Sequence, residues 1–394
     1  MMRLTAIRLA SWATGAACLA GLAAAPSRAD EGPPLDWHEI EPDAIVWAKP
    51  SVDKPVKALF LCYDLGTAEA MSVAHRLPLD YRTFEIGMAW SYANLNQPGK
   101  REELLQLLRE DFDVCVVAGG IGLATFPPEI QYHLFEKVVA GMGLVYFYSS
   151  PGPLPEALQK KARPAPLAEV VPALPLAFFR TLAEAPEQKT PSLDEQGFYI
   201  PSGFSGRAQA FGVDPLKRDI PAGWSLGESR IAFLPFARAG YVTRPNFVYA
   251  GTYTRDMYIY DDYFIAMLGK ALFWAARRTP DTRVLDVSPS GETLPLGTEP
   301  DARVTLTAAA AARVSLAYQV RDYQHRIHLD DTANADLAAG TNTVSLRLPL
   351  PDAGNYILDV WVKRGDKVVD WGTGFFALNG VGRITAITPT ADEL

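Results

Sequence analysis

VKALFLCY, residues Val56–Tyr63, is the stretch that decides the fold of the first half of the chain. Such an apolar run is typical of a parallel strand that helices cover on both faces. Further strands are predicted at 83–90, 113–118 and 143–148, and helices at 68–77, 100–110 and 128–139. Strands and helices that alternate at this spacing predict a parallel sheet with right-handed crossovers.

The pattern of strands and helices is interrupted by residues 151–221, which are rich in Pro, Ala and charged residues. We interpret this region as an insertion of loops and short elements. Strands are predicted to resume at 229–236 and 246–250. The α/β domain is therefore expected to span 56–280, with the insertion inside it.

The strongest helical periodicity of the chain lies at 261–278, where apolar residues recur at helical spacing. Asp261 and Asp262 are expected to open this helix, and Arg277 and Arg278 to close it. Both pairs complement the helix dipole, and the proline that follows favours a stop.

Beyond this helix the period of the apolar residues changes to two, which is typical of strands. The alternating sets are Val314, Leu316, Tyr318 and Val320, then Val344, Leu346 and Leu348, then Tyr356, Leu358, Val360 and Val362. They predict an all-β, immunoglobulin-like sandwich at 283–380, followed by a tail or linker at 381–394. DAGNY, Asp352–Tyr356, resembles the tyrosine corner of such domains.

The N-terminus is typical of a secretory signal. Arg3 and Arg8 precede an apolar stretch, and small residues at Ser27 and Ala29 favour cleavage near Ala29. The interpretation is a signal peptide at 1–29, a lead-in at 30–55, and a periplasmic or secreted protein. No later segment has the ~20 apolar residues that a transmembrane helix needs, so none is expected.

Charge and cysteine content exclude several classes of function. The formal net charge is −8, and removing the three arginines of residues 1–29 leaves −11, which argues against binding nucleic acid. Cys62 and Cys115 each lie within an apolar run, so buried thiols are favoured, and a disulfide between adjacent strands remains open. The chain has no metal-ligand spacing and no nucleotide-binding loop, so no metal and no cofactor are expected.

Three segments carry a resemblance to a known family. They are DVCVVAGGIG at 113–122, PPE at 127–129 with GMGLVYF at 141–147, and YDDYF at 260–264 leading into KALFWAA at 270–276. This pattern resembles the class I glutamine amidotransferase-like fold, in the non-catalytic branch seen in β-galactosidase trimerisation and trehalose-utilisation-type domains. The resemblance implies a flavodoxin-like parallel sheet, and it extends over roughly 56–278.

The chain departs from active members of that family at both catalytic positions. YSSPG at 148–152 stands where the resemblance implies a Gly-x-Cys-x-Gly elbow, and GTYTRD at 251–256 stands where it implies His-x-Glu. A thiolate nucleophile and its base are both required for amide hydrolysis. Glutamine amidotransferase activity is therefore not expected. The absence of both catalytic groups favours a protein without enzymatic activity over an enzyme.

Other chemistry has weak candidates. Ser150, next to Ser149, is the candidate hydroxyl at the degenerate elbow for an ester hydrolase. Glu228 and Asp256 are carboxylates expected near the carboxyl edge of the sheet for a glycosidase. Candidate ligand-binding residues are expected at that same edge, where open α/β sheets bind ligands. They are Trp90, Tyr92, Gly120, Tyr253, Arg255 and Tyr260.

The sequence leaves three functions open. The first is an exported, non-catalytic recognition or assembly module linked to polysaccharide handling, an inference by analogy, since the related domains accompany glycoside hydrolases. The second is a glycoside or ester hydrolase, and the third is a scaffold that binds proteins. The corresponding partners are a carbohydrate, another protein, or a second copy of the chain.

Overall fold

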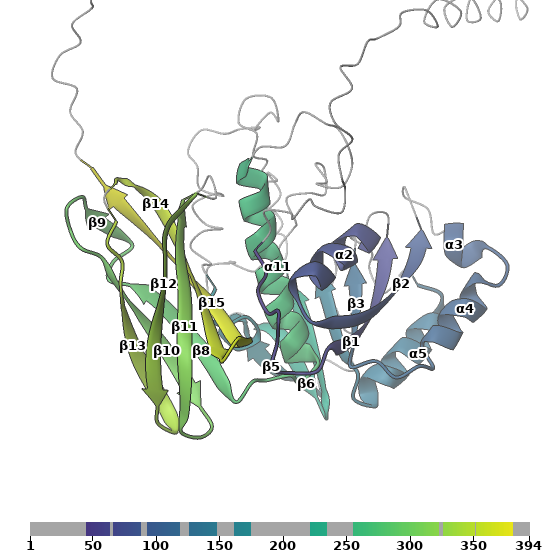
Figure 1. Cartoon of the computed structure of the whole chain (residues 1–394). Coiled ribbons are helices and arrows are strands. Elements are labelled where there is room, and N and C mark those ends of the chain that lie inside the picture. The colour runs from purple at the N-terminus through teal and green to yellow at the C-terminus, as the bar shows by residue number, and fades with distance from the viewer. Residues whose placement is uncertain are drawn as a thin grey trace, which may run out of the picture. The chain divides into compact units, whose positions relative to one another are not determined.

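The computed structural model describes residues 45–63, 66–87, 93–118, 126–147, 161–174, 221–234, 255–322, 326–350 and 352–380. All of these fall in one compact unit, Ala44–Leu394 (Figure 1). The predicted signal peptide at 1–29, most of the lead-in and the tail at 381–394 lie outside the described residues.

Strands and helices alternate through the first half of the chain. Their bounds are β1 (Val56–Tyr63), α2 (Gly66–Arg76), β2 (Leu79–Gly87), α3 (Ala93–Asn96), α4 (Lys100–Leu107), β3 (Val114–Ala118), α5 (Pro128–Val139), β4 (Gly143–Phe147), β5 (Arg163–Pro166), α7 (Leu167–Val170), β6 (Pro221–Leu226), β7 (Ser229–Leu234) and α11 (Arg255–Ala275). The strand predicted at 83–90 begins four residues earlier, since Leu79 pairs with Val56. Alternate residues of β2 are only half-buried, which obscured its start.

These strands form one sheet in the order β2-β1-β3-β4-β7-β6-β5. The pairs β2–β1, β1–β3, β3–β4 and β4–β7 are parallel, so these strands all end at the same edge of the sheet. The predicted insertion at 151–221 contributes β5 and α7, and β5 pairs with β6 at the sheet's end. The strand predicted at 246–250 lies outside the described residues.

Each face of the sheet has its own apolar core. One core joins the sheet to α2 and α11, and the other joins it to α4 and α5 (Figure 1). Cys62 belongs to the first core and Cys115 to the second. The two thiols lie on opposite faces of the sheet, so a disulfide between them is excluded.

The second half of the chain is a pair of packed sheets. Its strands are β8 (Thr282–Pro289), β9 (Thr293–Pro295), β10 (Asp301–Ala308), β11 (Ala312–Asp322), β12 (Ile327–Leu337), β13 (Gly340–Arg347), β14 (Gly354–Arg364) and β15 (Lys367–Asn379). The sheets β13-β10-β8 and β12-β11-β14-β15-β9 share a third core. The hydroxyl of Tyr356 donates a 2.9 Å hydrogen bond to the Asp352 carbonyl, the contact expected of a tyrosine corner.

Strand β14 is buried on both faces, which alternation alone does not predict. Tyr356, Leu358, Val360 and Val362 face the core between the two sheets. On the other face, Ile357 and Trp361 join the core that contains α11. We call this contact of α11 with β14 and β15 the seam.

Helix α11 begins six residues before its predicted start at Asp261, so Asp261 and Asp262 do not open it. It ends at Ala275 in a Schellman motif, in which Arg277 N–H donates to the Trp274 carbonyl and Arg278 N–H to that of Phe273. Arg277 has a φ of 58°, a left-handed conformation that glycine adopts more easily. The predicted closing pair therefore lies just beyond the helix.

Candidate functional site

The carboxyl edge of the parallel sheet is defined by the last residues of its strands. They are Tyr63 of β1, Gly87 of β2, Ala118 of β3, Phe147 of β4 and Leu234 of β7. The chain places β2 on one side of β1, and β3, β4 and β7 on the other side, so the direction in which strands are added reverses between β1 and β3. Open α/β sheets bind ligands in the crevice at such a point.

Most of the predicted site residues cannot be compared with this edge directly. Trp90, Tyr92, Gly120, Ser150 and Tyr253 lie outside the described residues.

The remaining predicted residues at this edge belong to α11. Arg255 and Asp256 lie in its first turn and Tyr260 in its second. The helix runs antiparallel to the strands, because its far end packs where β4 begins: a Cβ on Gly143 would lie 2.4 Å from the Ala275 carbonyl oxygen. The first turn of α11 is therefore directed towards the carboxyl edge.

Glu228 lies at the opposite edge, contrary to the prediction. It occupies the turn between β6 and β7, directly before Ser229 begins β7. Its carboxylate pairs with Arg277 at 2.9 Å, and both side chains are exposed. The sequence interpretation failed here because β6 was not recognised, so the turn was assigned to the wrong end of the sheet.

Glu228 and Asp256 therefore cannot act on one glycosidic bond. Glu228 contacts the residue that follows the C-terminal end of α11, and Asp256 lies in its first turn. Asp256 and Ala275 are 19 positions apart, which corresponds to a rise of about 28 Å along the helix. Glycosidase carboxylates are about 5 to 9.5 Å apart, so this pair is excluded.

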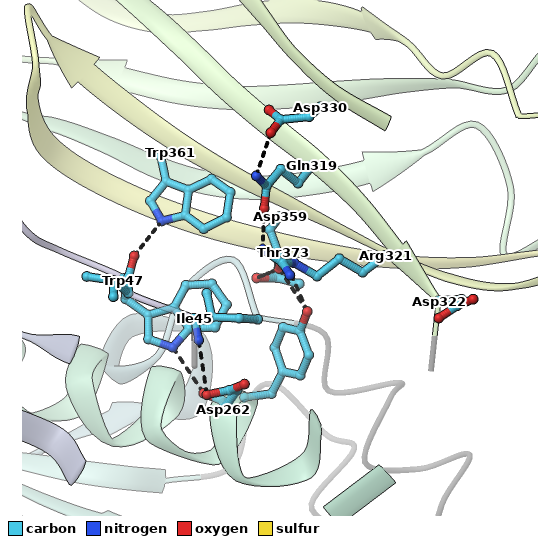
Figure 2. A network of polar contacts seen from close by, with 12 residues as sticks. Ile45, Trp47, Asp262, Gln319, Arg321, Asp322, Asp330, Asp359, Trp361 and Thr373 are labelled. Atoms are coloured by element: carbon cyan, nitrogen blue, oxygen red, sulfur yellow. Dashed lines mark hydrogen bonds and ion pairs between the residues drawn. The ribbon is translucent and has the colours of Figure 1, made fainter. Parts of the chain in front are cut away.

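A cluster of buried polar groups, which the sequence interpretation missed, surrounds Asp262 (Figure 2). Its Oδ1 accepts hydrogen bonds from Arg76 Nη2 at 2.7 Å and Nε at 2.9 Å, and from Ile45 N–H at 3.3 Å. Asp262 and Gly269 are seven residues, about two turns, apart and therefore lie on the same face of α11. Gly269 packs against the apolar side chain of Leu77 just after α2, so this is the apolar face of the helix. An acid on the apolar face of a helix is the signal that a buried cation lies opposite.

The last part of the predicted lead-in belongs to the core. Trp47 is fully buried, its Nε1 donates to the Asp262 carbonyl at 3.1 Å, and its ring stacks on Trp361. Trp361 Nε1 donates in turn to the Val46 carbonyl at 3.2 Å. The segment 45–52 thus joins α2, α11, β14 and β15, and we call it the strap.

A second buried carboxylate, Asp359, faces α11 from β14. It accepts hydrogen bonds from Tyr263 Oη at 2.9 Å and Thr373 Oγ1 at 3.1 Å, and Arg321 Nε lies 3.4 Å away (Figure 2). Burial raises the pKa of the Asp359 carboxyl to about 6, against the opposing effect of the Arg321 guanidinium. Burial, followed by the nearby Asp359 charge, raises the pKa of Tyr263 well above its ordinary value.

A third buried pair, Lys270 and Asp370, lies further along the seam. Lys270 Nζ donates to Asp370 and to the Trp371 carbonyl, and Asp370 Oδ2 accepts from Val284 N–H at 2.7 Å. Burial lowers the pKa of Lys270, and the Asp370 carboxylate opposes that shift. These side chains hold the two halves of the chain together.

Two further properties concern the described residues as a whole. No group of three or more His, Cys, Asp and Glu side chains among them is arranged to hold a metal ion. None of the helices in the described ranges is long and apolar enough to cross a membrane.

Comparison with known proteins yields only partial structural similarities. No family model and no curated protein matches the chain. A β-D-mannosidase from Dictyoglomus thermophilum aligns at 14% identity over 25% of this chain and 13% of that protein, with a TM-score of 0.23. A putative β-galactosidase from Bacteroides fragilis aligns at 16% over 24% and 17%, with a TM-score of 0.21. The C-terminal domain of wzt aligns at 10% over 28% and 85%, with a TM-score of 0.24.

Proposed function

We propose that the protein is an exported, non-catalytic recognition module that binds carbohydrate at the carboxyl edge of its parallel sheet. The observation that carries this proposal is the strand order β2-β1-β3-β4-β7, in which each successive pair is parallel. This order matches the flavodoxin-like arrangement, in which the ligand crevice opens between the first and third strands.

The same order supports the amidotransferase-like assignment of the α/β half. The Tyr356–Asp352 hydrogen bond supports an immunoglobulin-like assignment of the sandwich. Both assignments belong to this proposal, together with export through the signal peptide at 1–29. The link to carbohydrate rests on the resemblance to domains that accompany glycoside hydrolases.

The proposed ligand residues follow the strands that end at the crevice. Gly120 comes two residues after the end of β3, and Trp90 and Tyr92 come soon after the end of β2. Tyr253 precedes α11, whose first turn contains Arg255. Tyr260 lies on the same helix.

This set of side chains suits a sugar. Aromatic rings present flat apolar faces with a polar tip, which can stack on a sugar ring. The Arg255 guanidinium can pair with the carboxylate of a uronic acid through two hydrogen bonds. The hydrolase alternative loses its pair of carboxylates, because Asp256 lies in the first turn of α11, whereas Glu228 contacts Arg277 beyond the other end of that helix.

A thermal-shift screen against neutral and uronic-acid oligosaccharides tests the proposal. A bound sugar at ~100 times its dissociation constant adds about 2.7 kcal/mol, which raises the melting midpoint measurably. We expect at least one oligosaccharide to raise the midpoint and to be recovered uncleaved. Cleavage of the sugar would favour the hydrolase, and silence across the panel would favour a protein-binding scaffold.

A further inference from the structure

Asp359 is a buried acid whose charge is only partly compensated. Its side chain is completely inaccessible to solvent, and the nearest described cation is Arg321. Arg321 Nε is within ion-pair distance at 3.4 Å but makes no hydrogen bond to the described residues. Arg321 also donates to Gln319, which donates in turn to the exposed Asp330 (Figure 2).

The other described charged groups on the elements that pack around Asp359 are already paired. On α11, Asp262 pairs with Arg76, and Tyr263 contributes a neutral hydroxyl. On β15, Asp370 pairs with Lys270, and Thr373 contributes another hydroxyl. The strap contributes Trp47, which is neutral. Ionisation of Asp359 therefore adds a buried negative charge at the point where α11 meets β14, and Arg321 is the cation among the described residues that offsets it.

We propose that the seam is a proton-sensitive latch, in which neutral Asp359 holds α11 firmly against β14 and ionised Asp359 weakens that contact. When Asp359 is protonated, the buried charge disappears and the carboxyl O–H becomes a donor. The hydroxyl of Tyr263 or Thr373 can rotate to accept it, while the other hydroxyl keeps donating to the carboxyl group.

The direction of the pH effect follows from the folded-state pKa of about 6, which lies above the ordinary value of 3.8. Between these values the folded protein holds a proton that the unfolded chain releases. The stabilisation is fully present below about pH 4 and is lost as the pH rises through 6. A difference of about two units between the folded and the unfolded pKa of Asp359 corresponds to about a hundredfold change in the folding equilibrium constant.

Urea unfolding of the full chain and of Asp359→Asn, at several pH values from 4.5 to 7.5, tests the latch. Fluorescence of Trp47 in the strap and Trp361 in the seam contributes to the signal. We expect the folding constant of the wild type, divided by that of Asp359→Asn, to fall more than about tenfold as the pH rises. Asp336→Asn, at an exposed position of β12, is the matched control and should keep the wild-type profile.

Parallel pH profiles for the wild type and Asp359→Asn would overturn the proposal. Should Asp359→Asn not fold, Tyr263→Phe provides a second test, because it removes a donor that favours the charged carboxylate. Its stability transition should move to higher pH, and an unmoved transition would also overturn the latch. At pH 7.5, amide exchange should be faster in the wild type than in Asp359→Asn, with the largest difference in α11 and β14 and a smaller one in β10. An equal difference throughout the chain would contradict a local latch.

Discussion

The two ends of α11 carry the same kind of ion pair in opposite surroundings. Near the N-terminal end, Asp262 pairs with Arg76 at 2.7 Å, with side chains 1% and 8% exposed. Beyond the C-terminal end, Arg277 pairs with Glu228 at 2.9 Å, with side chains 45% and 85% exposed. Distance alone does not distinguish the two pairs, whereas burial does.

This difference indicates what each pair contributes. Breaking a buried pair leaves an uncompensated charge away from water, which is strongly destabilising. An exposed pair is screened by solvent, and its loss changes stability little. The buried pair at Asp262 therefore anchors the strap to α11, whereas the exposed pair beyond Ala275 contributes little.

The substitution Asp262→Ala should give the largest effect, a loss of about 3–5 kcal/mol in the free energy of unfolding. It leaves Arg76 buried without its carboxylate and removes the acceptor of Ile45 N–H. Urea unfolding measures the loss, and Glu228→Ala is the matched control at the exposed pair. A loss below about 1 kcal/mol for Asp262→Ala would refute the distinction between the two ends.

Arg277→Gly should stabilise the protein by up to about 1 kcal/mol. The left-handed φ of 58° at Arg277 costs an L-residue energy that glycine does not require, and the exposed pair with Glu228 is a small loss. The measurement compares the urea midpoint of Arg277→Gly with that of Arg277→Ala. The alanine variant loses the same ion pair but still places an L-residue in the left-handed conformation. Equal stability of the two variants would show that the backbone conformation at Arg277 is not strained.

Glu228→Gln should change the free energy of unfolding by less than about 0.5 kcal/mol. Its carboxylate is exposed in a turn at the amino edge of the sheet. We also expect no effect on the binding of any ligand, measured by the same thermal-shift screen. A loss of binding or of hydrolysis would return Glu228 to the candidate site.

Much of the fold could be predicted from periodicity, because strands buried on both faces and amphipathic helices leave clear patterns. The helix predicted at 128–139 coincides with α5, and the strand at 56–63 with β1. The early start of α11 could not be predicted. Asp261 and Asp262 resemble the opening of a helix, and only the position of Arg76 reveals that Asp262 is an interior residue.

The seam could not be predicted because it depends on contacts between residues far apart in the chain. Asp359 lies between Ile357 and Trp361 on one face of β14, and an apolar pair flanking an acid is ambiguous without the helix that covers it. Trp47 lies in a Pro- and Asp-rich segment that has no periodicity of its own. Tertiary packing decided both positions.

Calorimetric titration of an oligosaccharide found in the screen tests carbohydrate recognition at the carboxyl edge most directly. The proteins compared are the wild type, Trp90→Ala, and Tyr132→Ala as a matched aromatic control exposed on α5. We expect Trp90→Ala to weaken binding about tenfold or more, since an aromatic residue that packs on a ligand contributes at least about 1.4 kcal/mol. Tyr132→Ala should bind as the wild type does. Unchanged affinity in Trp90→Ala, with the loss in Tyr132→Ala instead, would contradict recognition at this edge of the sheet.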